Sequence, residues 1–120
     1  MPKDAAAVER GDARLAILAE PYLAHPDVDW GRMFSAMGLR VRGKVFALVN
    51  HSGRLMVKIP ESRADELVAN GTVQRMVMRE REMREWVELD YDAGDAAWSS
   101  LLAEAHTYLD RITLDEVTPR

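Results

Sequence analysis

Residues 38–59, GLRVRGKVFALVNHSGRLMVKI, decide the fold of this 120-residue chain. Apolar residues rich in valine and leucine form three short runs here. Two turn signals separate the runs, Arg42-Gly43 and the segment at residues 50–53, which ends in glycine. Runs of this kind between glycine-containing turns predict antiparallel strands joined as hairpins. We expect the first of the three strands to span about Met33–Val41.

If each turn is a two-residue loop, the pairing assigns every side chain to one face of the sheet, because successive side chains alternate. Leu39 then lies opposite Phe46, and Leu48 lies opposite Leu55. The first face is wholly large and apolar, with Met37, Leu39, Phe46, Leu48, Leu55 and Val57. The second face combines small and apolar residues with cations: Ala36, Gly38, Arg40, Val45, Ala47, Val49, Arg54, Met56 and Lys58. This register predicts a meander with one buried face.

Three helices are predicted from apolar residues at helical spacing. The first lies within residues 4–24 and is expected to end near Glu20, because the next residue is a proline that lacks a backbone donor. The second starts at Pro60 and stops at Asn70-Gly71. The third starts from Asp95 as its N-cap. Its apolar stripe is Trp98, Leu101, Leu102, Ala105, Leu109 and Ile112.

A second hairpin is predicted between the second and third helices, with its turn at residues 80–82. Its strands would span residues 72–79 and 83–90. The side chains expected to face the core are Met76, Met78, Val87 and Leu89. Those expected on the opposite face are Arg75, Val77, Arg84, Trp86 and Glu88.

Together these elements predict an α+β fold, in which an antiparallel five-stranded sheet carries its helices on one face. The expected order is αβββαββα. A chain of this length with 48% hydrophobic residues is expected to be a single domain over residues 1–120. Its core should span about residues 30–112, preceded by the N-terminal helix.

Charge is unevenly distributed along the chain, whose net charge is −4. Residues 31–86 hold eleven cationic and six acidic side chains, whereas both flanking regions are acidic. The chain has no cysteine, which excludes disulfides and thiolate chemistry. The sequence does not open with a signal-peptide pattern, and its apolar runs are shorter than the roughly 20 residues that span a bilayer. We expect a soluble, cytoplasmic protein that does not bind a membrane.

The sequence lacks recognisable motifs for catalysis, cofactors and metals. The three histidines, His25, His51 and His106, are far apart and lie on different predicted elements, without the spacing of a zinc site. Residues 90–95 superficially match a calcium loop, but its twelfth position is Leu101, where a bidentate glutamate is needed. We therefore predict no catalytic residue, no cofactor, no metal and no enzyme activity.

Several short strings together resemble the N-terminal domain of the TfoX/Sxy family. They are Arg32-Met33-Phe34, Gly38-Leu39, Gly43-Lys44-Val45-Phe46-Ala47-Leu48, Leu55-Met56-Val57-Lys58 and Trp86-Val87. The likeness covers about residues 30–112. The family is named for regulators of natural competence and includes stand-alone domains, and its fold is similar to the α+β sandwich of the YjbR/MmcQ group. No catalytic residue or cofactor is established for this domain, so the resemblance implies none here.

The chain departs from the family pattern at three points. Ser35-Ala36 stands where the family usually has a glycine pair, which is expected to alter the path of the first strand. The charged segment at residues 79–85 replaces a flexible stretch. The sequence also lacks the second, helical domain of the competence regulators, so the full regulatory function is not expected.

The second face of the sheet is the predicted interaction surface. Its residues are Arg40, Arg54, Met56, Lys58, Arg75, Arg84 and Trp86. Trp86 has two interpretations, a side chain covered by arginine stems or an aromatic contact anchor. A flat, partly apolar and cationic face is expected to be covered by a protein partner or by a second copy of the chain. One alternative is nucleic-acid binding through the same cations, which the acidic net charge disfavours. The weaker alternative is a small-ligand pocket.

Overall fold

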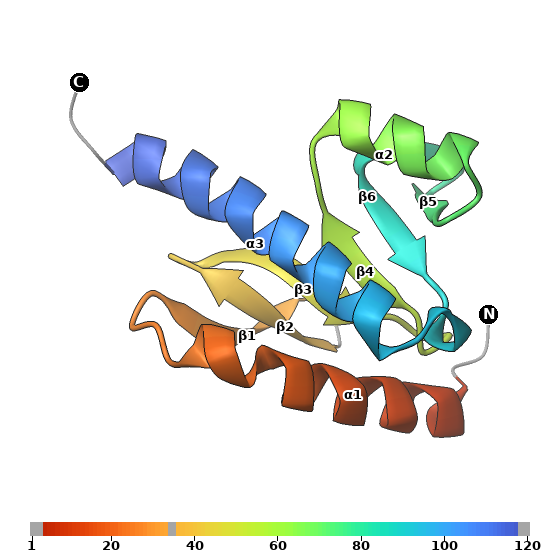
Figure 1. The fold of residues 1–120 in the computed structure, drawn as a ribbon, viewed down its shortest axis with the longest axis horizontal. Coiled ribbons are helices and arrows are strands. Elements are labelled where there is room, and N and C mark those ends of the chain that lie inside the picture. Colours follow the sequence, from red (N-terminus) through yellow and green to blue (C-terminus); the bar gives the residue numbers. More distant parts are fainter. Residues whose placement is uncertain (1–3, 34–35, 118–120) are drawn as a thin grey trace.

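The structure, a computed structural model, describes residues 4–33 and 36–117 (Figure 1). Its elements, in chain order, are α1 (Ala5–Leu23), β1 (Val28–Met33), β2 (Ala36–Val41), β3 (Lys44–Val49), β4 (Leu55–Lys58), α2 (Glu61–Ala69), β5 (Gln74–Met78), β6 (Arg81–Leu89), the short 3₁₀ helix η1 (Tyr91–Ala93) and α3 (Asp95–Val117). The described residues form an α+β fold, as predicted. Their antiparallel sheet has six strands rather than five.

The main core lies between one face of the sheet and the three α-helices. The strand order is β1-β2-β3-β4-β6-β5, and every neighbouring pair is antiparallel. In Figure 1, α3 crosses in front of the central strands and α1 runs below them. Trp98 of α3 is fully buried and donates its indole N–H to the carbonyl oxygen of Asp90 at 2.9 Å. Leu15 of α1 and Leu67 of α2 belong to the same core.

The additional strand is β1, which precedes the first strand expected from the sequence. The predicted strand at residues 33–41 corresponds to β2, and only its first residue, Met33, belongs to β1. β1 pairs with β2 along its whole length. Gly31 interrupts the apolar pattern of β1, because the side chain of Arg40 occupies the space where a Cβ would lie. Phe34 and Ser35 stand between the two strands in the sequence. These residues lie outside the described ones, as does the expected effect of Ser35 on the strand path.

A β-bulge in β3 changes the predicted register. The turn at Arg42-Gly43 is a two-residue loop, as predicted. Further along, however, Leu39 lies opposite Ala47 instead of Phe46. An extra residue in one strand reverses the alternation of the side chains beyond it. Phe46 and Ala47 therefore both lie in the main core.

The predicted faces are wrong beyond the bulge. Ala47 and Val49, expected on the outer face, are buried in the main core. Leu48, expected in the core, lies on the outer face. Met37, also expected in the core, is 48% exposed. The strand residues that the sequence correctly assigned to the core are Leu39, Phe46, Leu55, Val57, Val87 and Leu89.

The second hairpin is also shifted relative to its predicted register. Its turn is Arg79-Glu80, one residue earlier than predicted, and the pairing of β5 is irregular. Met76 and Met78, expected in the main core, pack on the outer face of the sheet instead. Arg75, expected on the outer face, forms an ion pair with Asp65 of α2 on the helix-covered face. The register explains both changes, because Arg75 pairs with Val87 of the main core and Met76 next to it therefore faces the other way.

α1 is longer than predicted and packs against the loop after β3. It continues through Pro21, which has no N–H to donate to the carbonyl of Ile17, a solvent-exposed residue. Asp4 caps the helix start by accepting a hydrogen bond from the Ala7 N–H at 3.1 Å. A Cβ on Gly53 would collide with the carbonyl oxygen of Ala7. This glycine therefore allows the loop to approach α1 directly.

Trp98→Ala should lower the free energy of unfolding by about 3–5 kcal/mol, because removing a large buried side chain leaves a cavity. Phe46→Ala should have a similar effect, since Phe46 is also fully buried. Trp86→Ala is the matched control, and we expect a smaller loss because Trp86 is only half-buried. Urea unfolding followed by circular dichroism measures these changes. Losses below about 1 kcal/mol at both Trp98 and Phe46 would contradict the assigned core.

Candidate functional site

A second apolar cluster lies on the outer face of the sheet. Leu48, Met56 and Met76 are buried there. The side chains packed around them are Met33, Ala36, Val45, Met78, Met83 and Trp86, all from strands. The solvent side of an antiparallel sheet is commonly polar. A buried methionine cluster on this side therefore marks the candidate site.

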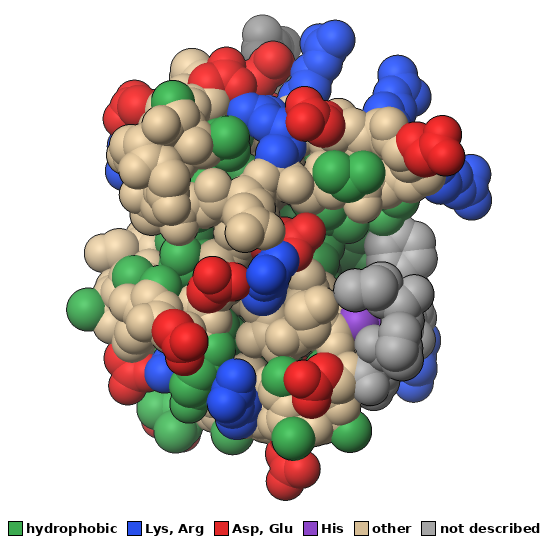
Figure 2. All heavy atoms as spheres, turned by 90° about the vertical axis from the view of Figure 1, so that its right-hand side faces the viewer, with side chains coloured by type: hydrophobic (Ala, Val, Ile, Leu, Met, Phe, Trp, Pro, Cys, Tyr) green, Lys and Arg blue, Asp and Glu red, His purple; other side chains and the backbone are tan. Residues whose placement is uncertain are grey.

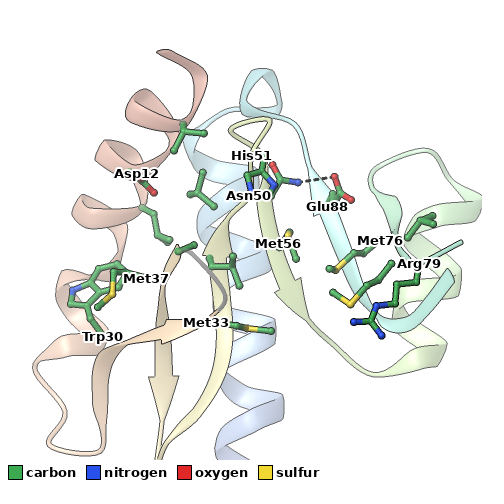
Figure 3. Close-up of a pocket in the computed structure, with 17 residues that line it drawn as sticks. Asp12, Trp30, Met33, Met37, Asn50, His51, Met56, Met76, Arg79 and Glu88 are labelled. Atoms are coloured by element: carbon green, nitrogen blue, oxygen red, sulfur yellow. Dashed lines mark hydrogen bonds between the residues drawn. The ribbon is translucent and has the colours of Figure 1, made fainter. Parts of the chain in front are cut away.

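This cluster forms part of a groove of about 960 Å³, which we call the methionine groove (Figure 3). Its walls come from α1, from all six strands, from the loop after β3 and from the β5–β6 turn. The lining residues are Val8, Asp12, Leu15, Trp30, Met33, Ala36, Met37, Leu48, Val49, Asn50, His51, Met56, Met76, Val77, Met78, Arg79 and Glu88. Five of the seven methionines of the chain are among them. Segments far apart in the sequence thus meet at one largely apolar depression.

The groove opens where the first two strands part from the rest of the sheet. β1 and β2 stay paired to the end of β1, whereas the pairing of β2 with β3 ends at Leu39 and Ala47. Gly38 lies next to this point, and a Cβ there would approach Cγ1 of Val45 to 2.8 Å. The beginning of β2 and the end of β3 both contribute side chains to the groove. The site therefore depends on the divergence of these two strands.

Methionine gives the groove an adaptable apolar surface. The side chain is unbranched and carries a polarisable thioether, so it can repack around differently shaped groups. On the rim, Met37 is 48% exposed and Val77 is 58% exposed. In the described part of the chain, the other large hydrophobic side chains that are exposed are Ile17 and Leu114. The groove thus presents apolar surface that a bound group would bury.

Three charged side chains line the groove, and they differ in their pairing. Glu88 accepts a hydrogen bond from Nδ2 of Asn50 at 2.9 Å (Figure 3) and lies 3.5 Å from Nη1 of Arg54. Asp12 also has an interaction partner. Arg79 has no ion-pair partner among the residues that the structure describes. Among the lining residues that the structure describes, Arg79 is therefore the charged side chain without an ion-pair partner.

Arg40 and Arg54, predicted for the interaction surface, are both neutralised by acids. Arg40 donates two hydrogen bonds to the Asp29 carboxylate, at 2.9 and 2.7 Å. These hydrogen bonds hold the pKa of Asp29 below its ordinary value. Arg54 forms an ion pair with Asp90 at 2.7 Å in addition to its contact with Glu88. Because their charges are balanced, these arginines do not make the face strongly basic.

The other residues of the predicted surface are divided between the two sides of the sheet. Met56 and Trp86 lie in the outer cluster. Lys58 lies 3.8 Å from the Glu85 carboxylate. Arg75 is on the helix-covered side with α2, and Arg84 is exposed without an acidic partner in the described residues. Figure 2 shows acidic and basic side chains interspersed over one face of the molecule.

Two histidines that are distant in sequence lie together. His25 and His106 stack with ring centroids 6.3 Å apart, and His106 also contacts Tyr22 and Phe46. Burial lowers the pKa of His106, and His25 lowers it further, against an opposing effect of Asp110. His51 lies at the groove instead. The described residues contain no group of three histidines, cysteines or acids that could hold a metal.

His106 should make stability pH-dependent, because its folded-state pKa lies below the ordinary value. Its contribution is complete above the unfolded pKa of about 6.5 and is lost as pH falls through the folded pKa. Between about pH 7.5 and pH 5.5, wild type should therefore lose more unfolding free energy than His106→Gln. His51→Gln, at an exposed position, is the control and should follow wild type. Equal losses of unfolding free energy in all three proteins would contradict the lowered pKa of His106.

The β5–β6 turn has an unusual backbone. Arg79 has φ 53° and Glu80 has φ 66°, so two successive residues with side chains adopt the left-handed conformation. Two-residue hairpin turns of this type favour Asn-Gly, because glycine has no steric cost at positive φ. Each of these residues therefore stores unfavourable free energy in the turn.

Glu80→Gly should raise the free energy of unfolding by about 0.5–1 kcal/mol, because glycine relieves the left-handed strain. Glu82→Gly, in the adjoining strand, is the matched control and should lower it by a similar amount. Urea unfolding of both variants measures the difference. A loss of stability at Glu80→Gly equal to that of the control would show that the turn is not strained.

The sequence analysis did not find the groove, although one signal was present. Six of the seven methionines fall within residues 33–83. The predicted register placed Met37, Met76 and Met78 in the main core, and it placed Met33 at the start of a strand. Only Met56 was placed on the outer face, where it lies. The density of methionine in the strands was the available indication of an adaptable surface.

Comparison with known proteins gives one match. A family model described as the TfoX N-terminal domain matches residues 23–106. Comparisons with curated proteins and with solved structures each found no match. The matched region contains all six strands and α2, and so most of the groove lining. A search of the described helices found none long and apolar enough to cross a membrane.

Proposed function

We propose that this chain, which belongs to the TfoX N-terminal domain family, is a non-enzymatic protein-interaction module. The family is not a known enzyme family. The proposed binding site is the methionine groove, and the proposed occupant is an apolar segment of a protein partner. The observation that carries the proposal is the groove itself, which joins a methionine floor to an exposed apolar rim.

The energetics of the rim support a protein occupant. Full burial of a valine or methionine side chain contributes about 1.5–3 kcal/mol, and both Met37 and Val77 are about half exposed. Met56 and Met76 are buried and also line the groove. Aromatic and methionine side chains are typical of the centres of protein interfaces, and Trp30 and Trp86 lie at or beside this surface.

Nucleic-acid binding has less support from the charges. Four of the five cations of the predicted surface have acidic partners. The groove also includes Asp12 and Glu88, which would repel phosphates.

A small-ligand site has one favourable observation. The groove volume of about 960 Å³ falls within the range of about 300–1,000 Å³ typical of such sites. The exposed rim favours a larger partner.

A photo-cross-linking amino acid at position 77 tests the proposal in the native host. Position 17 is the matched control, because Ile17 is 66% exposed but lies on α1 outside the groove lining. We expect protein adducts from position 77 and not from position 17, with circular dichroism showing that both proteins fold. An adduct of twice the chain mass would identify a second copy as the partner.

Two outcomes would contradict the proposed function. The first is an identical adduct pattern from positions 77 and 17, which would make the groove an ordinary solvated surface. The second is cross-linking at position 77 to nucleic acid alone.

A further inference from the structure

The methionine groove includes a split in the sheet, which lies between Ala36–Gly38 of β2 and Leu48–Val49 of β3. Both segments are strands, because β1 pairs with the first and β4 pairs with the second. They do not pair with each other, since the register of β2 with β3 stops at Leu39 and Ala47. Side chains of both segments line the groove. The groove therefore reaches strand backbone that has no neighbouring strand on one side.

The hydrogen bonds of β3 show where the Val49 backbone points. Asn50 donates its N–H to the carbonyl oxygen of Arg54 at 3.0 Å, directly beyond the β3–β4 register. Hydrogen-bonded and non-hydrogen-bonded pairs alternate along an antiparallel ladder, so Val49 and Leu55 form a non-hydrogen-bonded pair. The N–H and C=O of Val49 therefore point away from β4 and into the split. Val49 is only 3% exposed, and no described turn or loop group bonds to its backbone.

The backbone of Met37 points into the split from the other side. Ala47 lies two residues before Val49, so it also points toward β2, where it pairs with Leu39. Met37 lies two residues before Leu39 and directs its own N–H and C=O to the same side. Buried backbone groups without a partner cost free energy. An extended chain in the split would supply the partners that the register leaves out.

Apolar side chains cover the split on both faces of the sheet. Val8 and Leu15 of α1 line the groove on the helix-covered face, and Met56 and Met76 line it on the outer face (Figure 3). An extended chain sends successive side chains to opposite faces. Strands that are buried on both faces have nearly continuous apolar sequences. An occupant of the split is therefore expected to be continuously apolar, instead of alternating between apolar and polar residues.

The charges of the groove favour an acidic residue beside this apolar run. Arg79 lines the groove and has no ion-pair partner among the residues that the structure describes. Glu88 is already bonded by Asn50 and lies near Arg54. A carboxylate on the occupant would form a charge-assisted hydrogen bond with the free guanidinium.

We propose that the split binds an extended, continuously apolar segment of a protein partner. Its backbone pairs with Val49 and Met37, and an acidic residue beside the apolar run pairs with Arg79. The segment adds a strand inside the sheet instead of at its outer edge. This inference rests on the proposed function and adds the conformation and the sequence class of the occupant.

Synthetic peptides of about six residues, which span roughly 20 Å when extended, test the pairing. The parent peptide is a run of valine and isoleucine followed by one aspartate. In two derivatives, esters replace alternate backbone amides, at odd positions in one and at even positions in the other. We expect at least one derivative to bind about fivefold more weakly, because it lacks the N–H groups that face the split. Fluorescence anisotropy of labelled peptides measures the affinities.

Two further peptides test the sequence class. Replacing every second apolar residue by serine should weaken binding about tenfold, because serine would face one of the apolar walls. Replacing aspartate by lysine should weaken it about threefold, and Arg79→Glu should reverse this order. Arg111→Glu is the matched control, because Arg111 also has no ion-pair partner among the described residues but lies on α3, outside the groove lining.

Hydrogen exchange measured by NMR identifies where the parent peptide pairs. The amide of Met37, a residue that is 48% exposed, should exchange at least about tenfold more slowly when the peptide is bound. The amide of Val49 should be protected as well. The edge strands β1 and β5 are the control, and their amides should be unchanged. Protection of β1 or β5 instead would place the peptide at an outer edge and overturn the inference.

Other results would also overturn this inference. If both ester derivatives bind as tightly as the parent, the backbone of the occupant does not pair. If Met37 becomes protected in concentrated protein without peptide, the occupant is a second copy instead of a separate partner. If no peptide binds while position 77 still cross-links to protein in the host, the strand inference fails and the interaction module stands. If position 77 gives no protein adduct, the proposed function itself fails.

Discussion

The extra residue at Phe46 determines how the sheet divides its apolar side chains between two faces. Because the bulge puts Phe46 and Ala47 on the same side, the remaining residues of β3 change face. Leu48 then points outward and meets Met56 of β4, its partner in the register. In a regular strand, Leu48 would fill the main core instead. The outer cluster, and the groove above it, follow from this irregularity together with the pairing of β5, which places Met76 on the same face.

Local patterns predicted the elements and the fold class, because periodicity and turn residues act over a few positions. The hairpin at Arg42-Gly43, the helix around Trp98 and the core position of Leu55 could all be inferred in this way. The bulge could not. Val45 to Val49 is a continuous apolar run, so alternation within it cannot show which residue is extra. β1 was missed because Gly31 breaks its pattern, for a reason that lies on the neighbouring strand.

The charge of the candidate site was difficult to predict for a different reason. Cations are concentrated in the middle of the sequence, but their acidic partners come from segments that only the fold brings near. Arg54 reaches Asp90, and Arg75 reaches Asp65 on a helix. Exposed pairs of this kind contribute little to stability, about 0–1 kcal/mol each. Their larger effect is to cancel the field of the sheet face, which leaves apolar contact as its main property.

The close packing of α1 on the loop after β3 bears on where the folding unit begins. The family match starts at residue 23, after nearly all of α1. Yet Leu15 and Ala19 of that helix are buried in the main core. Gly53 also lies so close to the backbone of the helix that a side chain at this position would collide with it. A fragment restricted to the matched residues would expose a stripe of core and lose one wall of the groove. The family match thus covers fewer residues than those that build the main core.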